Sequence, residues 1–105
     1  VTVEAIDGSA TEAGDRGTFR FTRTGNLALS LPFSFTLTGT ATAGTDYNSI
    51  TTTLSFPANV ATLDRDVVPR VDSRVEVTET VIATIVDTAI YDVGVPASAT
   101  VVIAD

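Results

Sequence analysis

The segment Thr18-Phe19-Arg20-Phe21-Thr22-Arg23 decides the fold class, because its apolar and polar residues alternate one by one. In an extended strand this spacing puts Phe19 and Phe21 on one face and Arg20 on the other, whereas a helix would spread them around its surface. Residues 31–38 repeat the pattern. Both segments therefore predict half-buried β-strands.

Seven segments of this kind are separated by turns. Thr and Val dominate them, as expected of β-branched residues on a pleated surface, and glycine- or proline-containing stretches such as 39–46 and 93–96 lie between them. No stretch of ten residues carries the apolar stripe of a helix. An all-β, immunoglobulin-like β-sandwich of about seven antiparallel strands with Greek-key connections fits this pattern and the length of 105 residues. The predicted strands cover residues 1–6, 18–23, 31–38, 52–56, 61–69, 80–86 and 99–104.

The composition leaves few reactive groups. We expect one domain, 1–105, and the absence of an initiator Met suggests a module excised from a longer chain. All 6 basic residues are Arg, and the chain has no Lys, His, Cys, Met or Trp, which excludes imidazole bases, thiolates, Schiff-base amines and soft zinc ligands. A net charge of -7 argues against nucleic acid and anionic membranes as partners, and no apolar run is long enough for membrane insertion.

Acidic residues are predicted to gather at one end of the sandwich. If successive strands run in opposite directions, the loops after the first, third and fifth strands emerge together with the end of the last strand. Because like charges repel by roughly 1 kcal/mol per close pair even in water, we expect a cation among them, and calcium, with about six to eight oxygen ligands from flexible loops, fits best. The alternative is that these acids are solvated loop residues. Eight of the 13 acidic residues fall at this end: Asp7, Glu12, Asp15, Asp46, Asp72, Glu76, Glu79 and Asp105.

Several motifs resemble those of the Calx-β domain family. They are Gly39-Thr40-Ala41-Thr42-Ala43-Gly44-Thr45-Asp46-Tyr47, Phe56-Pro57-Ala58, Glu76-Val77-Thr78-Glu79-Thr80-Val81 and the ending Ala99-Thr100-Val101-Val102-Ile103-Ala104-Asp105. Together with Glu12-Ala13-Gly14 and residues 19–25 they cover nearly the whole chain. The resemblance implies a seven-stranded immunoglobulin-like sandwich that holds calcium at one tip. It assigns the metal ligands to Glu12, Asp46, Asp72, Glu76, Glu79 and Asp105.

Two departures from the family pattern bear on the strength of binding. Val71 stands where strong calcium binders of the family have a second Asp, and only Asp105 represents the acids that end the domain. Fewer carboxylates mean weaker binding, so we expect one or two ions with an affinity in the extracellular range of roughly 10⁻⁴ to 10⁻³ M.

The sequence therefore predicts a calcium-binding structural or adhesion module, a repeat module of a bacterial surface or secreted multidomain protein. We expect an extracellular or cell-surface location, with calcium ions, neighbouring domains of the same chain and another protein as partners. The alternative is a calcium-independent spacer or protein-interaction module with a degenerate metal site. An enzyme is not expected, because a glycosidase-like carboxylate pair needs an aromatic-lined sugar cleft, and the chain has 2 Tyr and no Trp.

Individual side chains carry further expectations. The strand Phe residues should fill the core, and Tyr47 should anchor the loop that carries Asp46. Arg20 and Arg23 are expected to be isolated charges that point outward from their strand.

Overall fold

Eight β-strands make up the regular structure of the residues that the computed structural model describes, which are 1–11, 15–25, 27–42, 44, 46–70, 78–87, 91, 93–94 and 96–104. Within these ranges no helix is long and apolar enough to cross a membrane. The strands are β1 (Thr2–Asp7), β2 (Ser9–Thr11), β3 (Gly17–Thr22), β4 (Leu31–Thr38), β5 (Thr53–Phe56), β6 (Thr62–Val67), β7 (Glu79–Ile85) and β8 (Ser98–Ala104).

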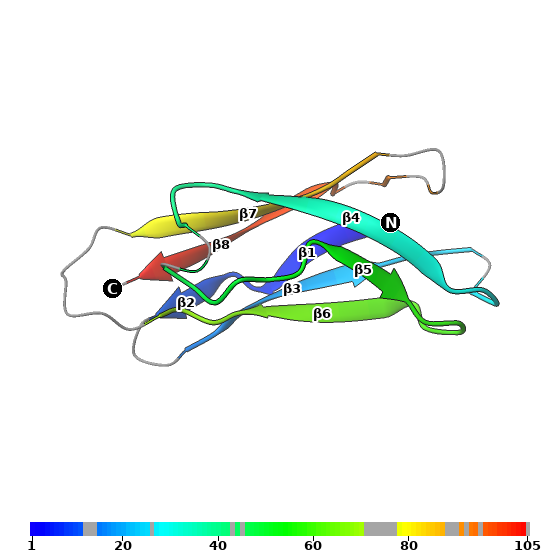
Figure 1. Cartoon of the computed structure of the whole chain (residues 1–105), viewed down its shortest axis with the longest axis horizontal. Coiled ribbons are helices and arrows are strands. Elements are labelled where there is room, and N and C mark those ends of the chain that lie inside the picture. Colours follow the sequence, from blue (N-terminus) through cyan, green and yellow to red (C-terminus); the bar gives the residue numbers. More distant parts are fainter. Residues whose placement is uncertain are drawn as a thin grey trace.

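The strands form two sheets that enclose one hydrophobic core (Figure 1). The smaller sheet has the order β1-β3-β6 and the larger one the order β2-β8-β7-β4-β5. The pairings are antiparallel except that of β2 with β8, which is parallel. Neighbours such as β3 and β6, or β4 and β7, are distant in the sequence, so the connections cross between the sheets. The predicted all-β sandwich is confirmed.

The predicted strands are all present, and the structure adds β2. This strand is only 3 residues long and follows β1 after Gly8, so no periodicity indicates it. The chain leaves the smaller sheet where the register of β1 against β3 shifts between Ala5 and Asp7, and it then joins the larger sheet beside β8. One continuous segment thus belongs to both sheets and links their edges.

The core is built from alternate residues of the strands, and its centre is aromatic. All 5 Phe are at most 3% exposed. The ring centroid of Phe21 lies 5.1 Å from that of Phe33 and 4.7 Å from that of Phe35, and Phe33 stacks on Phe56 at 4.7 Å. Such ring contacts contribute about 0.5–1.5 kcal/mol each beyond the burial of apolar area. The expectation of a Phe core is confirmed.

Arg23 is buried, which corrects the expectation that it points outward. Only 4% of its surface is exposed, and its guanidinium lies 5.3 Å from the centroid of the Phe56 ring. The β3–β4 and β5–β6 loops therefore close around a cation, which strand periodicity cannot indicate. Arg20 points outward as expected, but it is not isolated, because it forms an ion pair with Asp64 of the neighbouring strand β6. The Arg23 guanidinium donates hydrogen bonds to the carbonyl oxygens of Val60 (2.8 Å), Leu29 (2.7 Å), Leu27 (3.3 Å) and Pro57 (2.8 Å).

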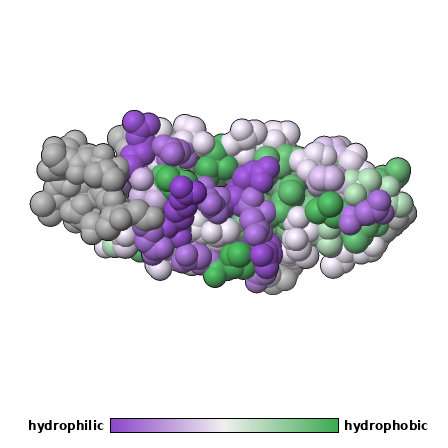
Figure 2. All heavy atoms as spheres, turned by 90° about the horizontal axis from the view of Figure 1, so that it is seen from below, coloured by the Kyte–Doolittle hydropathy of each residue, from purple (hydrophilic) through white to green (hydrophobic). Residues whose placement is uncertain are grey.

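The molecule is elongated, with extents of 47 × 21 × 19 Å and two different poles. The N-terminus and the loops held by Arg23 lie toward one pole, called here the N-terminal pole (Figure 1). The start of β7 and the end of β8 lie at the other, the C-terminal pole. Figure 2 looks at the molecule from the side of β6, where hydrophilic side chains form bands across the middle. Hydrophilic side chains thus cross this long side in bands, with hydrophobic patches between them (Figure 2).

Candidate metal centre

Several segments meet at the C-terminal pole. The start of β7 pairs with the end of β8 through Glu79 and Ile103, and the end of β8 pairs with β2. The loop after β4 joins them, because Ala41 N–H donates to the carbonyl oxygen of Thr80 (2.9 Å). The strand ends next to the acidic loops therefore lie at one end of the sandwich, as predicted from the alternating strand directions (Figure 1).

Asp46 is held in the β4–β5 connection by three hydrogen bonds. Its backbone N–H donates to Thr42 O (2.8 Å), and Thr42 N–H donates to its side-chain Oδ2 (2.7 Å). Its own carbonyl oxygen accepts from Arg70 N–H (2.9 Å). The residue is half-buried, and no described residue donates a hydrogen bond to Oδ1. An oriented carboxylate oxygen at the end of the sandwich is suited to a hard cation.

Tyr47 anchors this carboxylate to the core, as expected. Its side chain is 2% exposed, and its backbone forms an antiparallel bridge with Pro69. Burial, and to a smaller extent the negative charge of Asp46, raise the pKa of the Tyr47 phenol. The Asp46 charge is therefore close enough to the buried ring to act on it.

Glu79 is the second predicted ligand that the structure describes. It is the first residue of β7 and is half-buried, with its Oε2 enclosed by the protein. Glu79 thus places a partly enclosed carboxylate at the start of β7, and carboxylate oxygens are ligands that calcium accepts.

Thr40 and Thr80 tie the loop of Asp46 to the strand of Glu79. Thr80 N–H donates to Thr40 Oγ1 (2.9 Å), and Thr40 N–H donates to Thr80 Oγ1 (3.2 Å). Gly39 permits this approach, since its φ is +107° and a Cβ there would collide with the Thr80 carbonyl oxygen. This Thr40–Thr80 bracket was not predicted, although a Gly-Thr pair directly after a strand is a usable signal for a tight contact.

The other four predicted ligands, Glu12, Asp72, Glu76 and Asp105, lie outside the described residues. Thr11, which precedes Glu12, pairs with Ala104, which precedes Asp105. In the part of the chain that the structure describes, no three acidic side chains gather closely enough to hold a metal ion. Asp46 and Glu79 are thus the portion of the predicted site that the structure places at the pole.

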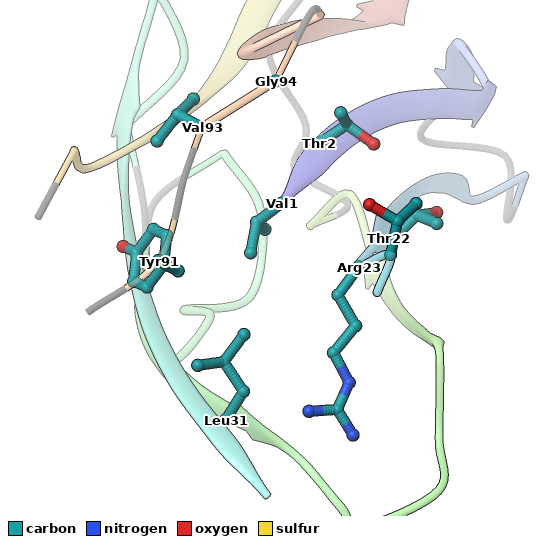
Figure 3. Close-up of a pocket in the computed structure, with 9 residues that line it drawn as sticks. Val1, Thr2, Thr22, Arg23, Leu31, Tyr91, Val93 and Gly94 are labelled. Carbon is teal, nitrogen blue, oxygen red and sulfur yellow. The ribbon is translucent and has the colours of Figure 1, made fainter. Parts of the chain in front are cut away.

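A pocket of about 350 Å³ lies at the N-terminal pole (Figure 3). It is bordered by the starts of β1 and β4, the end of β3, and Tyr91, Val93 and Gly94. Its ionisable side chains are Arg23, whose guanidinium is engaged by loop carbonyls, and Tyr91, whose hydroxyl donates to Val86 O. The described lining contains no carboxylate.

The fold is shared with solved Calx domains, one of which is described as a calcium-binding domain. The chain matches the calcium-binding domain CBD12 of CALX1.1 and CBD12 from CALX1.2 over 100% of its own length, each with a TM-score of 0.75 and 25% identity. It spans 44% of each of those chains but 98% of the apo-form Calx CBD1 domain, with a TM-score of 0.73 and 25% identity. No protein-family model and no curated protein matches the sequence. The chain nevertheless has the fold of these domains throughout, which confirms the resemblance seen in its motifs.

Proposed function

We propose that the chain is a calcium-binding module that holds Ca²⁺ at its C-terminal pole with loop carboxylates. The observation that carries the proposal is the fixed, half-buried position of Asp46 in a loop that the Thr40–Thr80 bracket joins to the strand of Glu79. The domain CBD12 of CALX1.1, which shares the fold, is described as calcium-binding, and this supports the proposal. A chain of net charge -7 without His or Cys offers oxygen ligands, which suit a hard cation.

Asp46 and Glu79 are the described ligands in this proposal. Calcium takes about six to eight oxygens, so two carboxylates do not complete its coordination, and further acids, backbone carbonyls and water must contribute. Magnesium demands near-octahedral geometry and is less suited to a site assembled from several loops. The further acids that the motif resemblance assigns are Glu12, Asp72, Glu76 and Asp105.

The physical effect of calcium in this proposal is to offset repulsion at the C-terminal pole. Carboxylates brought together by folding destabilise the folded state, and a bound dication converts that repulsion into attraction. Since calcium binds the folded state in preference to the unfolded one, it raises the free energy of unfolding. The loops that carry the ligands become less mobile, and the junction with any neighbouring domain becomes stiffer.

We further propose a structural or adhesive role in an extracellular or cell-surface multidomain protein of bacterial type. The N-terminus and the end of β8 lie toward opposite poles, an arrangement that suits modules joined end to end (Figure 1). The expected affinity of roughly 10⁻⁴ to 10⁻³ M matches extracellular calcium modules. In this setting the partners are calcium ions, adjacent domains and another protein, and the module itself is not an enzyme.

A calcium titration followed by thermal unfolding and calorimetry tests the proposal. At a calcium concentration about tenfold above Kd, selective binding to the folded state adds about 1.4 kcal/mol and raises Tm by roughly 5–10 °C. Asp46→Asn and Glu79→Gln should reduce this shift, whereas Asp64→Asn, on exposed β6, should leave it unchanged. Magnesium at equal ionic strength controls for screening. A wild-type Tm that does not respond to calcium contradicts the proposal.

A calcium-independent spacer or protein-interaction module is the second candidate, and Val71 is the observation that favours it. An aliphatic residue there replaces a carboxylate that strong binders of the resembling family carry. Under this candidate a chelator has no effect on Tm. Asp46→Asn then relieves repulsion and leaves the stability unchanged or slightly raised, the opposite of its effect on a calcium site.

A further inference from the structure

The outer edge of β6 is open to a further strand. Arg23 N–H donates to Ala61 O (2.9 Å), which fixes where the hydrogen-bonded pairs of the β3–β6 ladder fall. Because such pairs alternate in an antiparallel ladder, Thr62, Asp64 and Asp66 direct their backbone N–H and C=O groups away from β3. No strand among the described residues pairs with this edge. Unpaired edges of this kind are templates for another extended chain.

Just beyond β6, the same edge already accepts an extended segment. Asn48 N–H donates to Val68 O (3.0 Å), and Tyr47 forms an antiparallel bridge with Pro69. The outward carbonyl of Val68 agrees with the alternation assigned to β6. The described pairing ends at Asn48, before the chain reaches β5, so the backbone groups of β6 itself remain available.

A groove of about 360 Å³ lies beside this edge, between β5 and β6. Three half-buried aliphatic residues, Ile50, Leu54 and Val68, line it together with Arg65. The rest of the lining is polar: Asp66, which pairs with Arg16, and Asn48, Ser49 and Thr51. Figure 2 shows the β6 side of the molecule, where hydrophobic patches lie between hydrophilic bands. The groove thus offers three aliphatic side chains and the Arg65 cation next to outward-facing backbone groups, while the charge of Asp66 is offset by Arg16.

Arg65 differs from the other described arginines of this side. Arg16 and Arg20 each pair with an aspartate, at 3.6 and 2.8 Å. Arg65 is half-buried, has no carboxylate oxygen of a described residue within 4.0 Å, and donates instead to the backbone carbonyl of Asp64 (2.7 Å). The Arg65 side chain therefore occupies the Asp64 carbonyl oxygen, one of the hydrogen-bond acceptors that point outward from the edge of β6. A guanidinium in such a place is better stabilised by a carboxylate.

We propose that this groove binds an extended polypeptide segment that adds to β6 as a strand and places a carboxylate on Arg65. Backbone hydrogen bonds to the β6 edge give affinity, and the side chains that enter the groove give selectivity. Those side chains alternate along the segment, so an acid that meets Arg65 is flanked two positions away by apolar residues in contact with Leu54 and Ile50. Without such a segment, Arg65 covers the edge and opposes pairing with a second copy of the chain.

The test uses two blocked synthetic peptides, Ile-Thr-Glu-Thr-Ile and Ile-Thr-Lys-Thr-Ile, titrated into the full chain and followed by amide NMR. Their palindromic sequences put the charged residue on the groove face in either strand direction. We expect the Glu peptide to shift the amides of Thr62, Asp64 and Asp66 and to bind about fivefold tighter than the Lys peptide. This preference runs against the net charge of -7, which favours the Lys peptide everywhere else on the surface.

Two arginine variants separate the proposal from general electrostatics. Arg65→Gln should abolish the discrimination between the two peptides, whereas Arg70→Gln, which removes an exposed charge outside the groove lining, should preserve it. The proposal is overturned if neither peptide shifts these amides, if the Lys peptide binds as tightly as the Glu peptide, or if Arg65→Gln keeps the preference. It is also overturned if the wild-type chain alone dimerises through these amides in sedimentation and NMR dilution experiments, because a second copy is then the occupant.

Discussion

Replacement of Arg23 tests whether a buried cation holds the N-terminal pole together. Arg23→Met removes four hydrogen bonds of 2.7–3.3 Å to loop carbonyls and the contact with the Phe56 ring. A hydrogen bond from a charged donor contributes about 1.5–3 kcal/mol, but the sum overstates the loss, because methionine needs no desolvation and water can hydrate freed loop carbonyls. We expect a loss of about 3–5 kcal/mol, because several carbonyl oxygens lose their donor and each buried acceptor left unsatisfied costs about 1–3 kcal/mol.

Arg23→Lys keeps the positive charge but removes the planar, forked arrangement of the guanidinium donors. An ammonium has three donors at one point, so it can satisfy three of the four carbonyls at most, and it lacks the planar face that lies over Phe56. Urea unfolding followed by circular dichroism should show that Lys recovers less than half of the stability lost in Arg23→Met. Arg16→Lys, at a side chain that is 61% exposed, should change stability by less than about 0.5 kcal/mol. An Arg23→Lys variant as stable as the wild type would show that the positive charge alone, and not the geometry of the guanidinium, holds the loops together.

Three further variants test other contacts. The ion pair with Arg20 holds the pKa of the Asp64 carboxyl below its ordinary value, so the pair stabilises above the unfolded-state pKa of about 3.9 and its effect is lost as pH falls through the folded-state value. Asp64→Asn should therefore have a slightly lower Tm than the wild type at neutral pH, a difference that shrinks between about pH 4 and pH 2 in thermal melts. Gly39→Ala sets a Cβ against the Thr80 carbonyl at a φ of +107° and should lower the free energy of unfolding in urea by about 1–3 kcal/mol. An unchanged urea midpoint would contradict the close contact between Gly39 and Thr80. Thr80→Val removes the hydroxyl that accepts a hydrogen bond from Thr40 N–H and should lower the free energy of unfolding by about 1 kcal/mol. Under the proposed function it should also weaken calcium binding in calorimetry. Thr80→Ser keeps the hydroxyl and should retain both the stability and the calcium binding.

The strands and the core could be predicted because a period of two residues is a local property of the sequence. Phe21 and Phe33 are buried for the same reason that they alternate with polar residues. The burial of Arg23 could not be predicted, since it depends on loop carbonyls as far as 37 residues away in the sequence. β2 is likewise defined by its neighbour β8 and not by its own pattern.

In the candidate site, too, some features could be predicted from the sequence and others depend on tertiary contacts. The placement of Asp46 and the anchoring of Tyr47 follow from one short motif and from the parity of the strands. The Thr40–Thr80 bracket joins residues 40 positions apart and involves hydroxyls that look like ordinary strand residues in the sequence. Parity can indicate which loops share an end of the sandwich, but the contacts that orient each ligand arise only from the three-dimensional packing.

The parallel pairing of β2 with β8 sets how the module responds to mechanical tension. Both strands run toward the C-terminal pole, and a pull at Val1 and Ala104 along the long axis would draw them in opposite directions. The hydrogen bonds of the β2–β8 pairing are then loaded together in shear and do not break one after another. The pairs concerned are Ser9–Val102, Ala10–Ile103 and Thr11–Ala104. Resistance to extension therefore rests on the β1–β3 ladder and, beyond it, on a strand of only 3 residues that links the N-terminal segment to the last strand.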